Sequence, residues 1–122
     1  MKWEQFTTLE AAAKFAPTSP GVYAIGTVSR LHGLPISTSW AYIGMAKNLR
    51  QRIAQHLPNS EFNKMLRAWI HANHAVVEIW TKKLTSADEA DALETLMIGE
   101  LNPIFNTMKR TNLGKKDDNE QS

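Results

Sequence analysis

The sequence predicts a single domain of the α+β class, and three observations support this prediction. Three segments rich in β-branched and aromatic residues are typical of strands, at residues 21–27, 40–44 and 75–84. Other segments begin with capping residues and continue with apolar side chains at helical spacing. The 122 residues, 43% hydrophobic and 21% charged, have the composition of a soluble globular protein and show no repeat or low-complexity linker.

The composition also excludes several kinds of protein. Without cysteine, the chain can form no disulfide, no thiol nucleophile and no cysteine-rich zinc site. No run approaches the roughly eighteen apolar residues of a membrane span, and the N-terminal MKWEQFTTLE lacks the apolar core of a secretory signal. We therefore expect a cytoplasmic protein that makes no membrane contact.

The first elements are expected to be a short helix and a strand. In the segment TTLEAAAKFAP, Thr8 can cap a helix, the alanines favour it and Pro17 ends it. A Pro-Gly turn then leads into the strand GVYAIGT, residues 21–27. Alternation along this strand places Tyr23 and Ile25 on the same face of the sheet.

The next segments are expected to be a long hairpin loop and its returning strand. Glycine, proline and serine punctuate residues 29–39, which predicts a loop. The strand WAYIG, residues 40–44, follows, and alternation would put Trp40 and Tyr42 on one face. Gly44 interrupts the pattern at a point where another part of the chain could approach the backbone closely.

An amphipathic helix is expected after Asn48, a good N-cap. Its sequence LRQRIAQHL has apolar residues at helical spacing and ends before a proline. At about 100° per residue, Arg52 and His56 lie one turn apart on the flank of the apolar stripe, whereas Arg50 projects to the other side. Arg52 is therefore the arginine expected to lie against the body of the fold.

A further helix and a third strand complete the middle of the chain. Ser60 can cap a helix with the sequence EFNKMLRAWIHA, residues 61–72, whose aromatic and aliphatic side chains would supply bulk for the core. The segment AVVEIWTKKL, residues 75–84, is β-branched and alternates near its end, as a strand does.

The last helix carries the most unusual side chain. Ser86 and Glu89 have the spacing of a capping box, and Pro103 ends the helix. The apolar stripe consists of Ala90, Leu93, Met97, Ile98 and Leu101. Glu94 lies in the middle of this stripe, although an ionised carboxylate is seldom buried without compensation.

Three explanations for Glu94 remain open at this point. The carboxylate could pair with a structural arginine, reach the solvated rim of the stripe, or hold a divalent cation. Magnesium suits the last case, because it commonly binds through one or two carboxylates and keeps several water ligands.

Charge is unevenly distributed along the chain, although the overall net charge is only +2. Residues 45–83 have a net charge of +5, whereas residues 85–106 have a net charge of −5. A basic middle beside an acidic helix could form a groove for a phosphate backbone next to a metal-binding carboxylate. The alternative is ordinary charge scatter over solvated faces.

The residues from Tyr42 to His56 suggest a catalytic group. A tyrosine at a strand end, a glycine, then Arg52 and His56 would bring a phenol, a guanidinium and an imidazole towards one place. Phosphodiester hydrolysis needs a group that activates water, a cation for the developing charge and a metal near the leaving oxygen. Each residue taken alone also has a structural explanation: a packed tyrosine, a surface arginine or a histidine that fills a helix flank.

The order of these motifs resembles that of the GIY-YIG nuclease family. Gly21-Val22-Tyr23 is similar to the first half of the name motif, and Tyr42-Ile43-Gly44 is its second half to the letter. The further matching elements are the run from Met45 to Arg52, then His56, Ala92-Leu93-Glu94 and the segment from Leu101 to Asn106. One departure is the separation of Tyr23 from Tyr42 by eighteen residues, where the family usually has about ten.

The resemblance implies a small three-stranded mixed sheet flanked by helices, within residues 1–106, followed by a polar tail at 107–122 that we expect to be disordered. It also implies cleavage of DNA with one Mg²⁺ or Mn²⁺ ion. The implied catalytic residues are Tyr23, Tyr42, Arg52 and His56, with Glu94 as the metal ligand, Lys47 and Arg50 as contacts to nucleic acid, and Gly44 and Asn106 as structural residues near the site.

Two hypotheses from different functional classes follow. The first is a metal-dependent DNA endonuclease, and the second is a nucleic-acid-binding module that keeps the fold without cleavage. A protein-interaction domain without a role on nucleic acid is a third possibility. The longer hairpin contains Arg30 and His32, which could contact nucleic acid or keep the loop soluble. With no separate DNA-binding domain in the chain, we expect weak sequence preference, recognition of a DNA structure, or recruitment by a protein partner.

Overall fold

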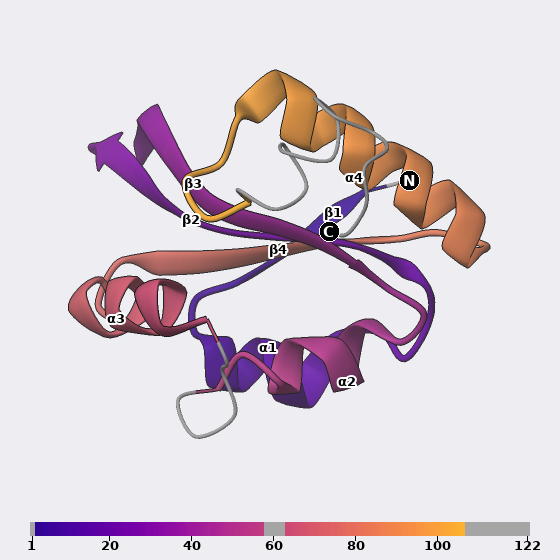
Figure 1. Cartoon of the computed structure of the whole chain (residues 1–122). Helices are drawn as coiled ribbons and strands as arrows, with labels where there is room; N and C mark the ends of the chain where they lie inside the picture. Colours follow the sequence, from indigo (N-terminus) through magenta and orange to yellow (C-terminus); the bar gives the residue numbers. More distant parts are fainter. Residues whose placement is uncertain (1, 58–62, 107–122) are drawn as a thin grey trace.

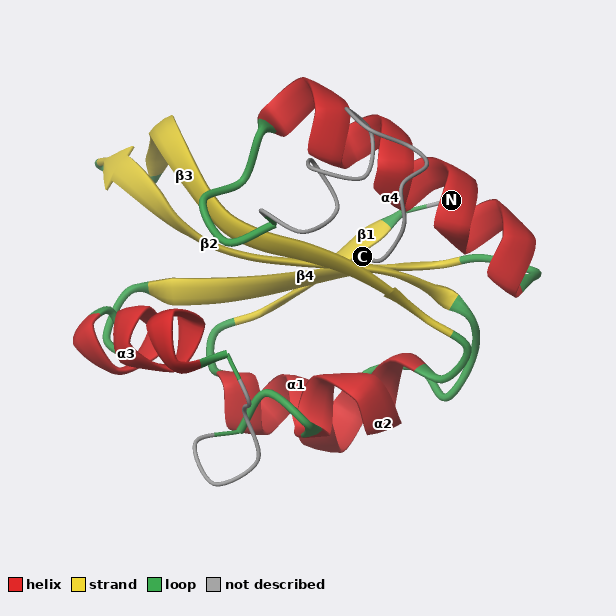
Figure 2. Ribbon diagram, in the orientation of Figure 1, coloured by secondary structure: helices red, strands yellow, loops and turns green. Residues whose placement is uncertain are grey.

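The computed structural model describes residues 2–57 and 63–106, and within them four strands form one antiparallel sheet (Figure 1, Figure 2). The strands are β1 (Trp3–Phe6), β2 (Gly21–Leu31), β3 (Leu34–Ala46) and β4 (Val77–Lys83), in the spatial order β1-β4-β2-β3. The predicted α+β class is confirmed. The expected three-stranded mixed sheet is wrong in two respects, since β1 adds a fourth strand and all pairings are antiparallel.

Helices cover both faces of this sheet (Figure 1). They are α1 (Leu9–Phe15), α2 (Leu49–Ala54), α3 (Lys64–Ala72) and α4 (Ala87–Leu101). In Figure 1, α4 lies on one face of the sheet, and α1 and α2 lie side by side on the other. None of the helices in the described part of the chain is long and apolar enough to cross a membrane.

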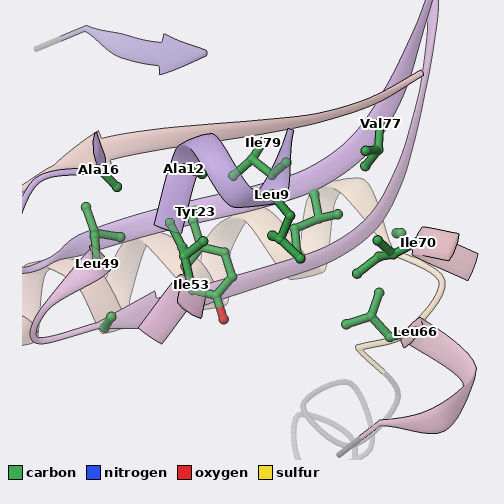
Figure 3. Packing of buried hydrophobic residues seen from close by; sticks show 13 residues of the cluster. Leu9, Ala12, Ala16, Tyr23, Leu49, Ile53, Leu66, Ile70, Val77 and Ile79 are labelled. Carbon is green, nitrogen blue, oxygen red and sulfur yellow. The ribbon is translucent and has the colours of Figure 1, made fainter. Parts of the chain in front are cut away.

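Alternation along β2 supplies a separate core to each face. Tyr23 and Ile25 belong to the larger cluster of buried residues, on the face covered by α1 and α2. Figure 3 shows Tyr23 among the labelled residues of this cluster. Val22 and Ala24 point to the other face and pack with Ala90 and other residues under α4. The prediction that Tyr23 and Ile25 share a face is confirmed, because side chains alternate strictly along a regular strand.

A bulge in β3 changes the expected facing of Trp40 and Tyr42. Gly26 pairs with Trp40 and Ile25 pairs with Tyr42, so Ala41 is an extra residue without a partner on β2. Trp40 therefore packs with the cluster under α4, whereas Tyr42 packs with the cluster on the other face. The prediction that these two rings share a face is wrong, because one extra residue reverses the alternation.

The expected loop at residues 29–39 is largely β-hairpin. Strands β2 and β3 continue to a two-residue turn of His32 and Gly33, whose φ values are 52° and 88°. Positive φ at both central positions is the requirement of a type I′ hairpin turn. Arg30, expected to be a loop residue, instead forms an ion pair with Glu78 on β4.

Helix boundaries differ from the predictions mainly at the ends. Helix α2 ends at Ala54, so His56 lies in the turn after the helix rather than on it. Helix α3 begins at Lys64 and is capped by Asn63, whose side chain accepts from the Leu66 N–H. The predicted cap Ser60 lies outside the described residues, as does the predicted tail 107–122.

The predicted start of α4 is confirmed, but its predicted apolar stripe is one residue too long. Ser86 caps the helix by accepting from the Glu89 N–H at 3.1 Å. Leu101, expected to be in the stripe, is 42% exposed. Leu101 is the last residue of the helix, and Asn102 follows it in the left-handed conformation that ends the helix.

Candidate active site

Two tyrosines and a histidine meet on the face of the sheet covered by α1 and α2. Tyr23 extends from β2 and Tyr42 from β3, with ring centroids 6.1 Å apart. His56 packs against both, with centroid distances of 5.3 Å to each ring. The Tyr23 hydroxyl and His56 Nε2 are 2.6 Å apart, and both side chains are buried. A short hydrogen bond between a phenol and an imidazole is a direct route for a proton between them.

Gly44 leaves the space that the Tyr23 ring occupies. The two residues face each other across the β2–β3 pairing. A Cβ atom at position 44 would lie 2.4 Å from the Tyr23 hydroxyl oxygen and 2.5 Å from Cζ. The close backbone approach expected at Gly44 is therefore present, and the neighbour is the Tyr23 ring.

Arg52 brings a positive charge to the two phenols. It lies in the last turn of α2 and is partly exposed. The negative charge that Tyr23 can carry raises the pKa of the Arg52 guanidinium above its usual value, and Tyr42 acts in the same direction. The attraction is mutual, so Arg52 also favours a negatively charged phenol oxygen at this place. Its Nη1 additionally donates to the Gln55 side chain at 2.5 Å.

Asn106 fastens the segment after α4 to the edge of β3. Its Oδ1 accepts from the Ile43 N–H and its Nδ2 donates to the Ile43 carbonyl, both at 2.8 Å. The Phe105 N–H donates to the Ala41 carbonyl at 2.8 Å, beside this pair. The side chain of Asn106 thus replaces a neighbouring strand at the residue that follows Tyr42.

Glu94 is buried on α4, on the other face of the sheet from the tyrosines. It is 8% exposed and lies on the same side of the helix as the buried residues Ala90 and Ile98. Helix α4 packs against β3 and β2, and β3 is the edge strand that carries Tyr42. Within residues 2–57 and 63–106, three or more His, Asp or Glu side chains do not gather in a group that could hold a metal ion.

The two basic residues expected to contact nucleic acid lie near the start of α2. Lys47 is exposed in the connection between β3 and α2. Arg50 is also exposed, but its Nε donates to the Ala16 carbonyl at 2.8 Å, which ties it to the end of α1. Lys47 is therefore exposed to solvent, whereas Arg50 also helps to hold α2 against the end of α1.

A pocket that was not predicted from the sequence adjoins His56. It has a volume of about 670 Å³ and lies between the start of α1 and α3. Its lining includes Lys64, Arg67 and His71. Their spacing of three and four residues on a predicted helix in the basic segment was the available signal.

The chain forms a small α+β domain, with phenol, imidazole and guanidinium groups against one face of an antiparallel sheet. The model of the GIY-YIG catalytic domain family matches residues 20–110. The chain therefore belongs to the GIY-YIG family, which confirms the resemblance seen in its motifs.

Two UvrABC system proteins C illustrate the similarity to known proteins. It is 35% identical over 103 residues to the UvrABC system protein C of Nitrobacter winogradskyi, covering 84% of this chain. It is 36% identical over 95 residues to the corresponding protein of Aquifex aeolicus, covering 78% of this chain. The chain spans only 13% and 15% of the lengths of these two relatives.

The chain is also similar to solved structures of the GIY-YIG N-terminal endonuclease domain of UvrC from Thermotoga maritima. The structure bound to its catalytic divalent cation, magnesium, has a TM-score of 0.54 and 28% sequence identity, and the match covers 80% of this chain and 94% of that one. A point mutant of that domain, also bound to its divalent cation, matches with a TM-score of 0.54 and 30% identity.

Proposed function

We propose that this protein is a divalent-metal-dependent DNA endonuclease that hydrolyses phosphodiester bonds. The observation that carries the proposal is the 2.6 Å contact between the Tyr23 hydroxyl and His56 Nε2, next to the guanidinium of Arg52. Membership of the GIY-YIG family and similarity to an endonuclease domain that binds magnesium support it.

The Tyr23–His56 pair would handle the proton of the attacking water. Hydrolysis forms a bond between the water oxygen and phosphorus, breaks one ester P–O bond, and releases a proton from the water. Tyr23 would accept that proton on its phenol oxygen, because Arg52 favours negative charge there and His56 takes up the phenol proton. The leaving oxygen would be protonated by solvent.

Arg52 and Tyr42 would act on the phosphate itself. A guanidinium has donors in a planar fork that match phosphate oxygens, and it remains charged at every relevant pH. Arg52 is partly exposed and so is accessible to a substrate. Tyr42 would orient the same phosphate through its hydroxyl. Gly44 and Asn106 would act indirectly, by fixing the positions of Tyr23 and β3.

Glu94 fits a magnesium or manganese ion as a single protein carboxylate ligand. One carboxylate with water completing the shell is a common arrangement for Mg²⁺. The lack of any larger acidic or histidine group among the described residues agrees with one carboxylate rather than an all-protein cage. When bound, such an ion would supply a Lewis acid at Glu94.

Nicking of supercoiled plasmid DNA in the presence of Mg²⁺ or Mn²⁺ tests the proposal. We expect wild-type protein to nick the plasmid and Arg52→Ala to lower the rate about 10²- to 10³-fold, as loss of a donor to a developing oxyanion does. Glu94→Gln should abolish the metal-dependent reaction. Glu100→Gln removes an exposed carboxylate from the same helix and should keep wild-type activity.

Metal binding gives a second readout that does not depend on activity. Calorimetric titration with Mn²⁺ should show one site that is lost in Glu94→Gln and kept in Glu100→Gln. Absence of nicking by wild-type protein that still binds DNA would favour the non-cleaving module. Equal nicking by wild type and both site variants would show that the assigned residues are wrong.

A further inference from the structure

The pocket between α1 and α3 has the properties of a binding groove for a nucleic-acid backbone. We infer that it holds the DNA strand beside the cleaved bond, an inference that rests on the proposed endonuclease function. We call it the α3 groove. Its volume is about 670 Å³, and the side chains that matter for binding are His56, Lys64, Arg67, His71, His74 and Glu10.

The α3 groove is continuous with the candidate active site through one residue. His56 lines the groove and is also hydrogen bonded to the Tyr23 hydroxyl. The imidazole therefore separates the reacting groups from the groove by the width of one ring. A strand whose phosphate contacted Tyr23 and Arg52 would find the groove directly beside it.

The charge of the groove suits a polyanion. Lys64 and Arg67 are both exposed and lie three residues apart, which places them on one side of α3. Among the lining residues in the described part of the chain, Glu10 is the only carboxylate.

The length of the basic face suits a chain of phosphates better than a single anion. Lys64 and His71 are seven residues apart on α3, which corresponds to about 10 Å along the helix axis. That distance is roughly three base-pair steps along the axis of a duplex, at about 3.4 Å of axis per phosphate of each strand. A single bound phosphate could not contact both ends of this face.

The other parts of the lining suit a sugar or a base. The rings of His71 and His74 are stacked, with centroids 6.3 Å apart and an angle of 29° between their planes. Both histidines are exposed, and flat rings of this kind can stack with bases. Leu9, Ile70 and Val77 add apolar surface between the charged side chains.

Binding of a fluorescein-labelled DNA duplex, measured by anisotropy in EDTA at 50 to 200 mM salt, separates this inference from the cleavage reaction. The test variant is Lys64→Ala/Arg67→Ala. The matched control is Lys14→Ala/Lys83→Ala, which removes the same charge from exposed positions outside the groove. The test variant should lower the slope of log affinity against log salt by about 2, since each lost phosphate contact lowers it by about 1.

We also expect the test variant to bind about tenfold or more weakly at fixed salt, with the control within twofold of wild type. In the plasmid assay it should raise KM and leave kcat nearly unchanged, because it touches neither Tyr23 nor Arg52. A slope and KM equal to those of wild type would overturn the groove while leaving the nuclease intact. If the test variant loses binding and the wild-type protein does not cleave DNA, the groove would be supported and the nuclease function refuted. Failure of wild type to bind DNA in EDTA would overturn the groove.

Discussion

Replacing Gly44 with alanine should displace the Tyr23 ring and destabilise the protein. The added Cβ would lie 2.4 Å from the Tyr23 hydroxyl oxygen, 2.5 Å from Cζ and 2.7 Å from Cε1. All three distances are below the 3.0 Å that real Cβ contacts respect. The Tyr23 ring is completely buried and its hydroxyl is held by His56, so it cannot move aside freely.

The magnitude follows from the cost of overpacking a core. Forcing extra atoms into a packed site costs typically about 1–3 kcal/mol. For a domain of this size that corresponds to a fall in Tm of roughly 4–12 °C. The effect at Gly44 is steric, since Gly33 is the glycine with positive φ among the described residues.

Urea denaturation followed by circular dichroism measures this loss, and Gly99→Ala is the matched control. Gly99 lies inside α4, and an added Cβ there meets nothing within 4 Å. Alanine at that position should raise stability by up to about 1 kcal/mol, as it does within helices generally. If Gly44→Ala changed stability by less than about 0.5 kcal/mol, the packing of Tyr23 against Gly44 would be wrong.

Three further changes probe other contacts. Tyr23→Phe should cost about 1–3 kcal/mol in denaturation experiments, because it removes a hydrogen bond between two buried side chains, and an unchanged stability would contradict the bond. Asn106→Ala should cost about 2 kcal/mol and speed hydrogen exchange of the Ile43 amide, whereas unaltered exchange would show that the segment is held in another way. Hydrogen bonds from the Thr85 hydroxyl and backbone N–H lower the pKa of the Glu89 carboxylate below its ordinary value, so its stabilising effect is present above that ordinary pKa and is lost as the pH falls through the lowered pKa. Stability measured against pH should show this loss in wild type, and a profile unchanged in Glu89→Gln would refute it.

Local rules predicted the helix starts well. Thr8, Asn48 and Ser86 each cap the helix expected from the sequence, since the capping bond depends only on residues three positions away. Strand β1 escaped prediction because it has only four residues and exposes two of them. It becomes a strand only by pairing with β4, a contact between segments far apart in the chain.

The hairpin at residues 29–39 escaped prediction for a different reason. Its strand residues beyond Ser29 are exposed, so they show no alternation of polar and apolar side chains. Glycine and proline were read as loop signals, although Gly33 belongs to a two-residue turn. Pro35 lies on β3, an edge strand, where a missing N–H is tolerated.

The motif order suggested which rings would lie together, but it gave neither their geometry nor the position of Glu94 on the other face of the sheet. The motif order singled out Tyr23, Tyr42, Arg52 and His56, and the structure brings the three rings together with the guanidinium beside the phenols. Helical spacing had placed His56 on the flank of a helix, whereas it lies in the following turn and is buried. His56 is buried against Tyr23 because of packing between segments far apart in the chain, which local helical spacing does not reveal.

The arrangement of the site depends on the bulge at Ala41. Without the extra residue, strict alternation would put Trp40 and Tyr42 on the same face of the sheet. One of the two rings would then no longer pack against the buried cluster that it contacts here. With it, Trp40 packs under α4 while Tyr42 meets Tyr23 and His56. Because β3 is an edge strand, its outer backbone is also free to bond Phe105 beside the bulge and Asn106 just after it. One irregular residue in an edge strand therefore determines both which ring reaches the reacting groups and how the end of the domain is fastened next to them.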